Sequence, residues 1–269
     1  MAFKDQVAQG LVWTARRSLL GRGKLRGQLL SLLKGPMGLA YLDTRIDGRP
    51  LRLHLDNNSE AKFLVSPGVF NAREFAFIRD RMPRDGGVFV DVGANAGIFA
   101  FTAAAHAHTR CRVLCIEPNP MMVERMRRNV LREGAFALQT VRIAIEACAV
   151  SDGDGEGWLD LGHGLGMARL AGGGASEGGV KVPLRRLDAV LRAHGLDHVD
   201  VLKIDVEGHE DKALRPLLAE ENRALWPGAI IIEHCSRELW GTDVIASLMA
   251  SGYRDMGRTR NNLMLVLDA

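Results

Sequence analysis

Two kinds of hydrophobic pattern follow one another along this chain. Between residues 51 and 56, leucines alternate one by one with polar residues, which is the two-residue period of a half-buried strand. Gly48 separates this stretch from a second extended stretch at residues 41–47, so the pattern predicts a hairpin. Residues 72–82 are expected to form a helix that leads into the main part of the fold.

From Gly87 onward, short apolar runs alternate with helical stretches. This alternation predicts an α/β fold of the Rossmann-like kind, with a mostly parallel sheet and helices on both faces. The expected strands cover residues 88–92, 112–117, 144–150, 199–206, 229–235 and 263–267, with a short one near Tyr253, and the expected helices cover residues 98–108, 119–133 and 238–250.

A glycine-rich segment interrupts this rhythm. Residues 162–179 contain eight glycines and lie between two expected strands, 157–161 and 180–184. We expect the segment to be either a mobile lid over a substrate cleft or a surface loop.

The segment before the hairpin is expected to be a basic helical extension. Residues 1–34 carry seven Lys and Arg residues and one acid, Asp5, for a net charge of +6, whereas the whole chain carries +3. Such a helix either lies on an anionic membrane surface or packs on the rest of the domain or on a partner. Because the positive excess is confined to this segment, we expect no nucleic-acid partner.

These patterns divide the chain into two parts. The extension covers residues 1–36 and the α/β domain covers residues 37–269, with its core at 86–269 and the hairpin and first helix at 37–85.

Composition indicates the class of protein and its cellular location. Hydrophobic residues make up 47% of the chain and charged residues 25%, which is typical of a soluble globular protein. No apolar stretch approaches the roughly 20 residues of a membrane span, and no signal peptide is recognised. The four cysteines form no CxxC pair, so we expect reduced thiols and a cytoplasmic location, with the inner membrane face as a second option through residues 1–34.

The strongest chemical signal is a glycine-rich turn between an expected strand and an expected helix. Asp91, Gly93, Asn95 and Gly97 follow one another at every second position. Glycines at such a turn let a ligand approach the backbone, and the helix N-terminus adds backbone donors. The motif therefore predicts a nucleotide-like cofactor rather than a simple packing turn.

Three features favour S-adenosylmethionine over a dinucleotide. The second glycine of the dinucleotide fingerprint leaves room for pyrophosphate, and Asn95 occupies that position here. S-adenosylmethionine has no phosphate, so an acid at Asp91 is compatible with its ammonium and sulfonium groups. A short-chain dehydrogenase would need a lysine four residues after a tyrosine, but Arg45 and Gly257 follow the two tyrosines of this chain at that distance.

Ionisable residues also end the next two strands. Glu117, 24 residues beyond Gly93, is placed to accept both hydroxyls of a ribose, although a surface acid is the simpler alternative. Ser151 and Asp152 follow the third strand, where they either bind the purine edge or form a turn.

The fourth strand carries charges where its carboxyl end should meet the cleft. Buried charges are costly unless paired, so Lys203 and Asp205 either form an ion pair that holds the strand end or take part in the site. Glu207 and His209 follow directly, and the next strand ends in Glu233 and His234.

Together these motifs resemble the FkbM family of methyltransferases. The likeness covers about residues 70–267 and rests on D-V-G-A-N-A-G at 91–97, E-P at 117–118, A-V-S-D at 149–152, K-I-D-V-E-G at 203–208 and the strand ending at Glu233. The resemblance implies a class I methyltransferase that uses S-adenosylmethionine as its cofactor. It also implies O-methylation of a hydroxyl on a sugar, glycolipid or secondary metabolite. The cofactor-binding residues we expect are Asp91, Gly93, Asn95, Gly97, Glu117, Ser151, Asp152 and Asp205.

O-methylation needs a base that removes the hydroxyl proton. His209 is the first candidate because the imidazole pKa is near neutral, and Glu207 and His234 follow. Each histidine also has a purely structural interpretation, as the start of a helix or the end of a strand. No metal is expected, although Asp205, Glu233 and His234 together are a conceivable divalent-cation site.

Several other functions remain open from the sequence. They are a nicotinamide oxidoreductase, a nucleic-acid or protein methyltransferase, and a non-catalytic protein that binds S-adenosylmethionine. A nucleic-acid enzyme would bind RNA with a strong salt dependence, and a non-catalytic protein would tolerate loss of Asp205, Glu207 and His209.

Overall fold

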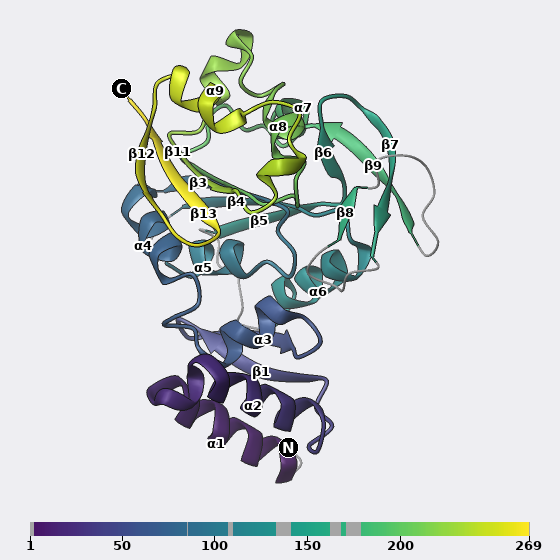
Figure 1. Ribbon diagram of the computed structural model, residues 1–269, viewed down its shortest axis with the longest axis vertical. Helices are drawn as coiled ribbons and strands as arrows, with labels where there is room; N and C mark the ends of the chain where they lie inside the picture. The colour runs from purple at the N-terminus through teal and green to yellow at the C-terminus, as the bar shows by residue number, and fades with distance from the viewer. Residues whose placement is uncertain are drawn as a thin grey trace.

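A seven-stranded sheet forms the centre of the molecule, seen in a computed structural model that describes residues 3–84, 86–106, 110–132, 141–161, 168–170 and 179–268 (Figure 1). The spatial order of its strands is β12 (Tyr253–Arg258), β13 (Asn262–Leu267), β11 (Ala229–Glu233), β10 (Val201–Ile204), β3 (Gly87–Val92), β4 (Cys111–Ile116) and β5 (Val141–Glu146). Neighbours from β11 to β5 pair in parallel, and β13 is antiparallel to both of its neighbours. The predicted α/β fold with a mostly parallel sheet is confirmed.

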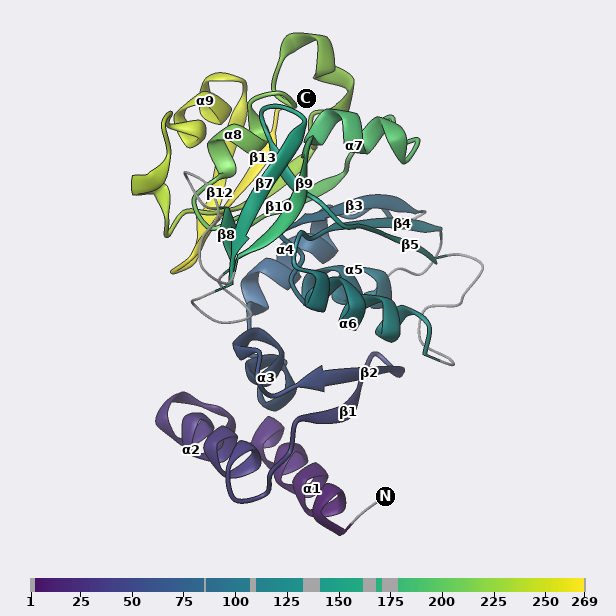
Figure 2. The same cartoon turned by 90° about the vertical axis from the view of Figure 1, so that its right-hand side faces the viewer.

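Helices cover both faces of this sheet because its strands are apolar on both sides (Figure 2). In β3, Phe89 packs into the core shared with α4 (Ala72–Arg81), α5 (Ile98–His106) and α6 (Pro120–Val130). Its neighbours Val88 and Val90 point to the core on the opposite face of the sheet, which three other helices cover. These are α7 (Leu187–Ala193), α8 (Glu210–Leu214) and α9 (Val244–Ala250).

Residues 3–65 form a helical and hairpin unit beneath the sheet in Figure 1. Its elements are α1 (Phe3–Arg17), η1 (Leu19–Gly21), α2 (Gly23–Lys34), β1 (Tyr41–Ile46), β2 (Arg49–His54) and α3 (Asn58–Val65). The predicted hairpin is confirmed, and Asp47 and Gly48 form its turn with φ angles of 45° and 81°. Helix α3 was not expected from the sequence; the side chain of Asn57 caps its first turn by accepting from the backbone N–H groups of Ser59 and Glu60.

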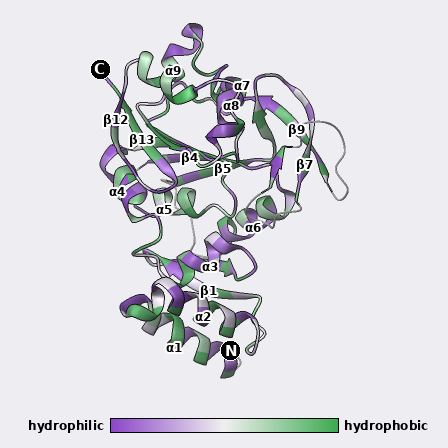
Figure 3. Ribbon diagram, viewed as in Figure 1, coloured by the Kyte–Doolittle hydropathy of each residue, from purple (hydrophilic) through white to green (hydrophobic). Residues whose placement is uncertain are grey.

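The basic extension is two helices rather than one, and it packs on the hairpin and α3. Val12 of α1 and Leu33 of α2 are buried in the same core as Leu51. Hydrophobic and hydrophilic residues alternate around both helices (Figure 3), and Trp13 and Leu19 are 59% and 68% exposed. Contact of these helices with a membrane surface stays a prediction. In the described part of the chain, no helix is both long and apolar enough to cross a bilayer.

A second, four-stranded sheet lies beside the central one and corrects one expected strand. Its order is β6 (Ala149–Ser151), β9 (Val180–Arg186), β7 (Gly155–Asp160) and β8 (Arg169–Leu170). The single strand expected over 144–150 is wrong: the chain leaves the central sheet after Glu146, whose carboxylate bonds Arg185 and His194. Of the glycine-rich segment, residues 162–167 and 171–178 lie outside the described residues, so its expected role as a lid or loop is untested.

The helix expected over 238–250 is also wrong in its extent. The chain forms a short turn, η3 (Arg237–Leu239), and α9 begins only at Val244. Asp243 starts α9 because its side chain accepts from the backbone N–H of Ala246 at 3.2 Å.

Candidate active site

A cavity of about 430 Å³ opens at the carboxyl ends of β3, β4, β10 and β11. This is the position at which open α/β sheets bind their ligands. Of the residues predicted to serve the site, six line the cavity: Gly93, Asn95, Glu117, Asp205, Glu207 and His209.

The glycine turn brings two strand ends into direct contact. Gly93 has a φ of 70°, and a Cβ atom there would lie 1.8 Å from the carbonyl oxygen of Asp205. The glycine is therefore required by the approach of β3 to β10, and not only by an approaching ligand. Gly97 does not line the cavity; it packs against Phe101 and Met126 where α5 meets α6. Its role in cofactor binding stays a prediction.

A buried lysine connects the same two strands. The Nζ atom of Lys203 donates to the carbonyl oxygen of Gly93 at 2.9 Å and lies 3.4 Å from Asp91 and 3.6 Å from Asp205. Burial alone would lower the pKa of Lys203, but the two carboxylates outweigh it and raise that pKa. Asp91 is fully buried behind the turn, and its other oxygen accepts from the backbone N–H of Ala100 at 3.2 Å. This network fixes the floor of the cavity.

Glu117 ties the end of β4 to the glycine turn. One carboxylate oxygen accepts from the backbone N–H of Asn95 at 2.7 Å, and the other accepts from that of Asn119 at 2.8 Å. Burial raises the pKa of Glu117 to about 7. Each carboxylate oxygen has a second lone pair, so Glu117 can accept further hydrogen bonds from ligand hydroxyls in the cavity.

His209 and Glu207 form the titratable wall of the cavity. The Nε2 atom of His209 lies 3.0 Å from the hydroxyl of Ser151, and burial lowers the pKa of the imidazole below 6.5. For Glu207, burial and the nearby carboxylates of Asp205 and Glu233 raise the pKa to about 7. The cavity therefore holds a neutral imidazole beside a carboxyl group that titrates near neutrality.

The loop that carries these two residues is held in a strained conformation. Glu207 has a φ of 54°, which is uncommon for a residue with a side chain. The carboxylate of Glu210 accepts from the backbone N–H groups of Val206 at 2.8 Å and Gly208 at 3.1 Å, and from the indole N–H of Trp240 at 2.7 Å. Glu210 thus fixes the loop from behind.

The other predicted site residues have protein partners or lie apart. Asp152 pairs with Arg215, and neither Asp152 nor Ser151 lines the cavity. His234 does not line it either, and its backbone N–H donates to Asn261. Their predicted roles in binding or catalysis stay predictions.

Three carboxylates lie close together at the edge of the cavity. Within the described residues, oxygens of Asp205, Glu210 and Glu233 lie within 4.8 Å of one another. Because Glu210 already accepts from two backbone N–H groups and an indole N–H, its carboxylate is engaged in holding the loop, and we assign no metal to the cluster.

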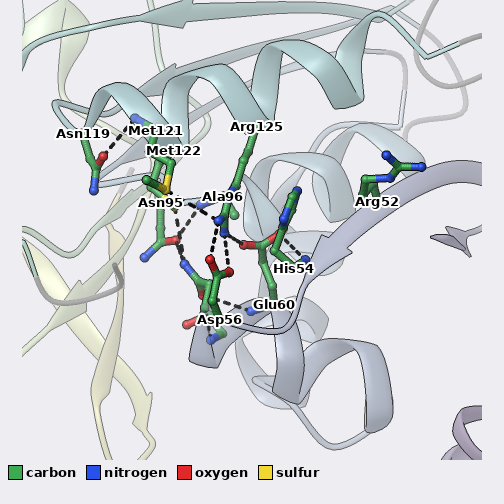
Figure 4. Close-up of polar contacts among 12 residues, drawn as sticks. Arg52, His54, Asp56, Glu60, Asn95, Ala96, Asn119, Met121, Met122 and Arg125 are labelled. Carbon is green, nitrogen blue, oxygen red and sulfur yellow. Dashed lines mark hydrogen bonds and ion pairs between the residues drawn. The ribbon is translucent and has the colours of Figure 1, made fainter. Parts of the chain in front are cut away.

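The N-terminal unit reaches the glycine turn through a polar cluster that is largely buried, with Asp56 exposed (Figure 4). Arg125 of α6 pairs with Asp56 at 2.7 Å and with the fully buried Glu60 at 2.9 Å. Next to this pair, the side-chain amide of Asn57 donates to the side-chain oxygen of Asn95 at 2.6 Å. The residue that caps α3 therefore also holds a residue of the cavity.

Replacement of Asn57 separates these two functions. In Asn57→Ser the hydroxyl still caps α3 but no longer donates to Asn95, so we expect the free energy of unfolding to change by less than about 1 kcal/mol. The dissociation constant for S-adenosylhomocysteine should nevertheless rise about 5- to 10-fold, because one hydrogen bond that orients Asn95 is lost. Calorimetric titration and chemical denaturation measure the two quantities. The exposed neighbour Asn58→Ala is the control, and equal affinity in the two variants would contradict this coupling.

Several residues in and behind the cavity were not recognised in the sequence. Asn57 with Glu60 three residues later is a helix-start pattern that would have predicted α3. In contrast, nothing in the local pattern marks Arg26 of α2 or Lys62 of α3 as cavity residues. Their position depends on how the N-terminal unit packs.

Comparisons with known proteins identify the family of the chain. A family model described as the methyltransferase FkbM domain matches residues 91–255, more than half of the chain. No curated protein matches the chain.

Solved structures resemble it at low identity. The methyltransferase FkbM from Methylobacillus flagellatus KT is 18% identical with a TM-score of 0.46, over 78% of this chain and 54% of that one. A methyltransferase from Geobacter sulfurreducens is 15% identical with a TM-score of 0.44, over 74% and 78%. A putative SAM-dependent methyltransferase from Streptococcus mutans is 8% identical with a TM-score of 0.47, over 85% and 56%. The chain thus spans little more than half the length of the first and third.

Proposed function

The chain belongs to the FkbM family of methyltransferases, and on that premise we propose that it methylates a hydroxyl group of a small-molecule or glycan acceptor, such as a sugar, a glycolipid or a secondary metabolite. The fold is that of class I methyltransferases, and S-adenosylmethionine is the cofactor. The observation that carries the choice of an oxygen acceptor is the neutral imidazole of His209, which lines the same cavity as the glycine turn.

The residues on the floor of the cavity fit this cofactor. Glu117 presents free lone pairs for the ribose hydroxyls, and the carboxylate of Asp205 offers negative charge to an ammonium or sulfonium group. S-adenosylmethionine supplies a methyl group on a positively charged sulfur. Gly93 and Asn95 form the turn against which the cofactor would lie.

His209 takes the proton in this proposal. With S-adenosylmethionine bound, its methyl group would pass from sulfur to the acceptor oxygen, and the imidazole of His209 would take the hydroxyl proton. With Nε2–H donated to the hydroxyl of Ser151, Nδ1 keeps the lone pair that receives this proton. Ser151 is then a positioning residue for the base.

The pH dependence distinguishes His209 from Glu207 as the base. A base must be unprotonated to act, so kcat/KM should rise with pH and then reach a plateau. Because burial lowers the pKa of His209, the midpoint should lie below 6.5. With Glu207 as the base, the midpoint would lie near its pKa of about 7. His209→Gln should lower kcat/KM about 100- to 10,000-fold, whereas the exposed His198→Gln should leave it unchanged.

The acceptor itself is found by transfer of an isotopically labelled methyl group. The full chain is incubated with labelled S-adenosylmethionine and a cell extract separated into small molecules, glycolipids, protein and nucleic acid. We expect the label in an ether that resists base, in the small-molecule or glycolipid fraction. Label in protein or nucleic acid would replace this proposal with one of the alternative methyltransferases. No transfer, together with intact binding of S-adenosylhomocysteine, would favour a non-catalytic binding protein.

A further inference from the structure

The acidic and the basic residues that line the cavity come from different parts of the fold. The acids all follow strands of the central sheet: Glu117 after β4, Asp205 and Glu207 after β10, and Glu233 at the end of β11. Lys203, the cation of the floor, is engaged with Asp91 and Asp205. The floor of the cavity is therefore anionic, as a positively charged methyl donor requires.

Three further charged residues of the lining are cationic and come from elements outside that sheet. They are Arg26 from α2, Lys62 from α3 and Arg169 from β8, and we call these three residues the cationic wall. In Figure 2, α2 and α3 lie well away from the central sheet, and β8 belongs to the second sheet. Three separate parts of the fold thus each bring one cation to the same cavity.

The cationic wall lacks internal partners. Across the described residues, neither an ion pair nor a side-chain hydrogen bond engages Arg26, Lys62 or Arg169. Arg26 is half-buried, and a guanidinium that loses water without gaining a partner is unfavourable. Lys62 and Arg169 are exposed, so burial makes a partner necessary for Arg26 alone, while all three side chains are available to a ligand anion in the cavity.

We propose that the cationic wall binds a phosphate group of the acceptor, so that the enzyme methylates a hydroxyl of a phosphate ester. This inference rests on the proposed function and names the class of its substrate. A single carboxylate carries one charge and is satisfied by one arginine, whereas a phosphate carries up to two charges and three oxygens that accept from several cations. The separation of charge would also orient the acceptor, because its phosphate is attracted to the wall and repelled by the floor.

The test measures anion binding on the full chain loaded with S-adenosylhomocysteine, with inorganic pyrophosphate as the probe in a low-salt calorimetric titration. The wall variant is Arg26→Gln with Lys62→Gln and Arg169→Gln. The control variant removes the same charge at exposed positions away from the cavity, by Lys24→Gln with Arg127→Gln and Arg142→Gln. We expect the wall variant to bind pyrophosphate at least about tenfold more weakly, and the control variant to stay within about twofold of wild type.

A second arm distinguishes a soluble phosphate ester from a lipid headgroup. Sedimentation with phosphatidylglycerol vesicles is compared for the same three proteins. Pyrophosphate binding that only the wall variant loses supports a soluble ester. A lipid headgroup is supported if wild type binds vesicles but not pyrophosphate, and only the wall variant loses vesicle binding. Equal behaviour of the two variants, or no binding of either probe by wild type, overturns the proposal. S-adenosylhomocysteine affinity, measured in every sample, reports separately on the proposed function.

Discussion

Replacement of Gly93 by alanine is expected to lower the free energy of unfolding by more than about 4 kcal/mol, or to prevent folding altogether. The added Cβ atom would lie 1.8 Å from the carbonyl oxygen of Asp205, and that oxygen belongs to backbone that no side-chain rotation can move. The φ of 70° adds strain for any residue with a side chain. To make room for the alanine side chain, β3 and β10 would have to move apart. That movement would break the contact between Lys203 and the carbonyl of Gly93.

Chemical denaturation followed by circular dichroism measures this effect. Gly10→Ala is the matched control, because Gly10 lies within α1 and an added Cβ meets nothing within 4 Å. The control should be more stable than wild type by about 0.5–1 kcal/mol, since alanine favours a helix. A Gly93→Ala protein that unfolds within 1 kcal/mol of wild type would show that β3 and β10 do not approach as described.

Lys203→Met should cost about 3–5 kcal/mol of stability and abolish measurable binding of S-adenosylhomocysteine. Methionine nearly matches the length of lysine, so the main loss is the charge that compensates Asp91 and Asp205. An uncompensated buried carboxylate has a pKa raised by burial, so the folded variant binds a proton more tightly than the unfolded chain. Its stability is therefore expected to fall as the pH rises from about 4 toward that raised pKa.

The comparison needs one control and one rescue variant. Lys181→Met removes an exposed lysine that pairs with Glu156, and it should change stability by less than about 0.5 kcal/mol. Adding Asp91→Asn to Lys203→Met removes the buried charge and should restore part of the stability, most clearly at pH 8. If Lys203→Met were equally destabilised at pH 5 and pH 8 and unaffected by Asp91→Asn, the loss would be one of packing rather than charge.

The sequence predicted the central sheet well because its signals are local. Apolar runs such as Val88–Val92 are buried on both faces, and a strand of that kind is recognisable without its neighbours. The glycine turn and Glu117 were found for the same reason: each follows directly from a strand end. Asp205, Glu207 and His209 share this origin at the end of β10.

What the sequence could not predict depends on distant contacts. Ser151 was noted for its place after the third strand, but the contact of its hydroxyl with His209, 58 positions later in the chain, could not be predicted. The glycines of the turn were explained by the approach of a ligand. Gly93 is needed because the backbone carbonyl of Asp205, just after β10, leaves no room for a side chain. Arg26 lies in a segment that was interpreted by its net charge alone, and only the packing of α2 brings it to the cavity.

The polar cluster around Arg125 limits how relatives could exchange N-terminal segments and so change their acceptors. The anionic floor of the cavity is encoded after residue 86, while two of the three residues of the cationic wall are encoded before residue 66. A chimera that takes residues 1–71 from a relative could thus acquire a different acceptor and keep its methyl donor. The exchange works only if the incoming segment retains Asn57 and Glu60, because these residues engage Asn95 and Arg125 of the recipient. Exchange of residues 1–71 between relatives is therefore limited by the few side chains that join this segment to the rest of the chain.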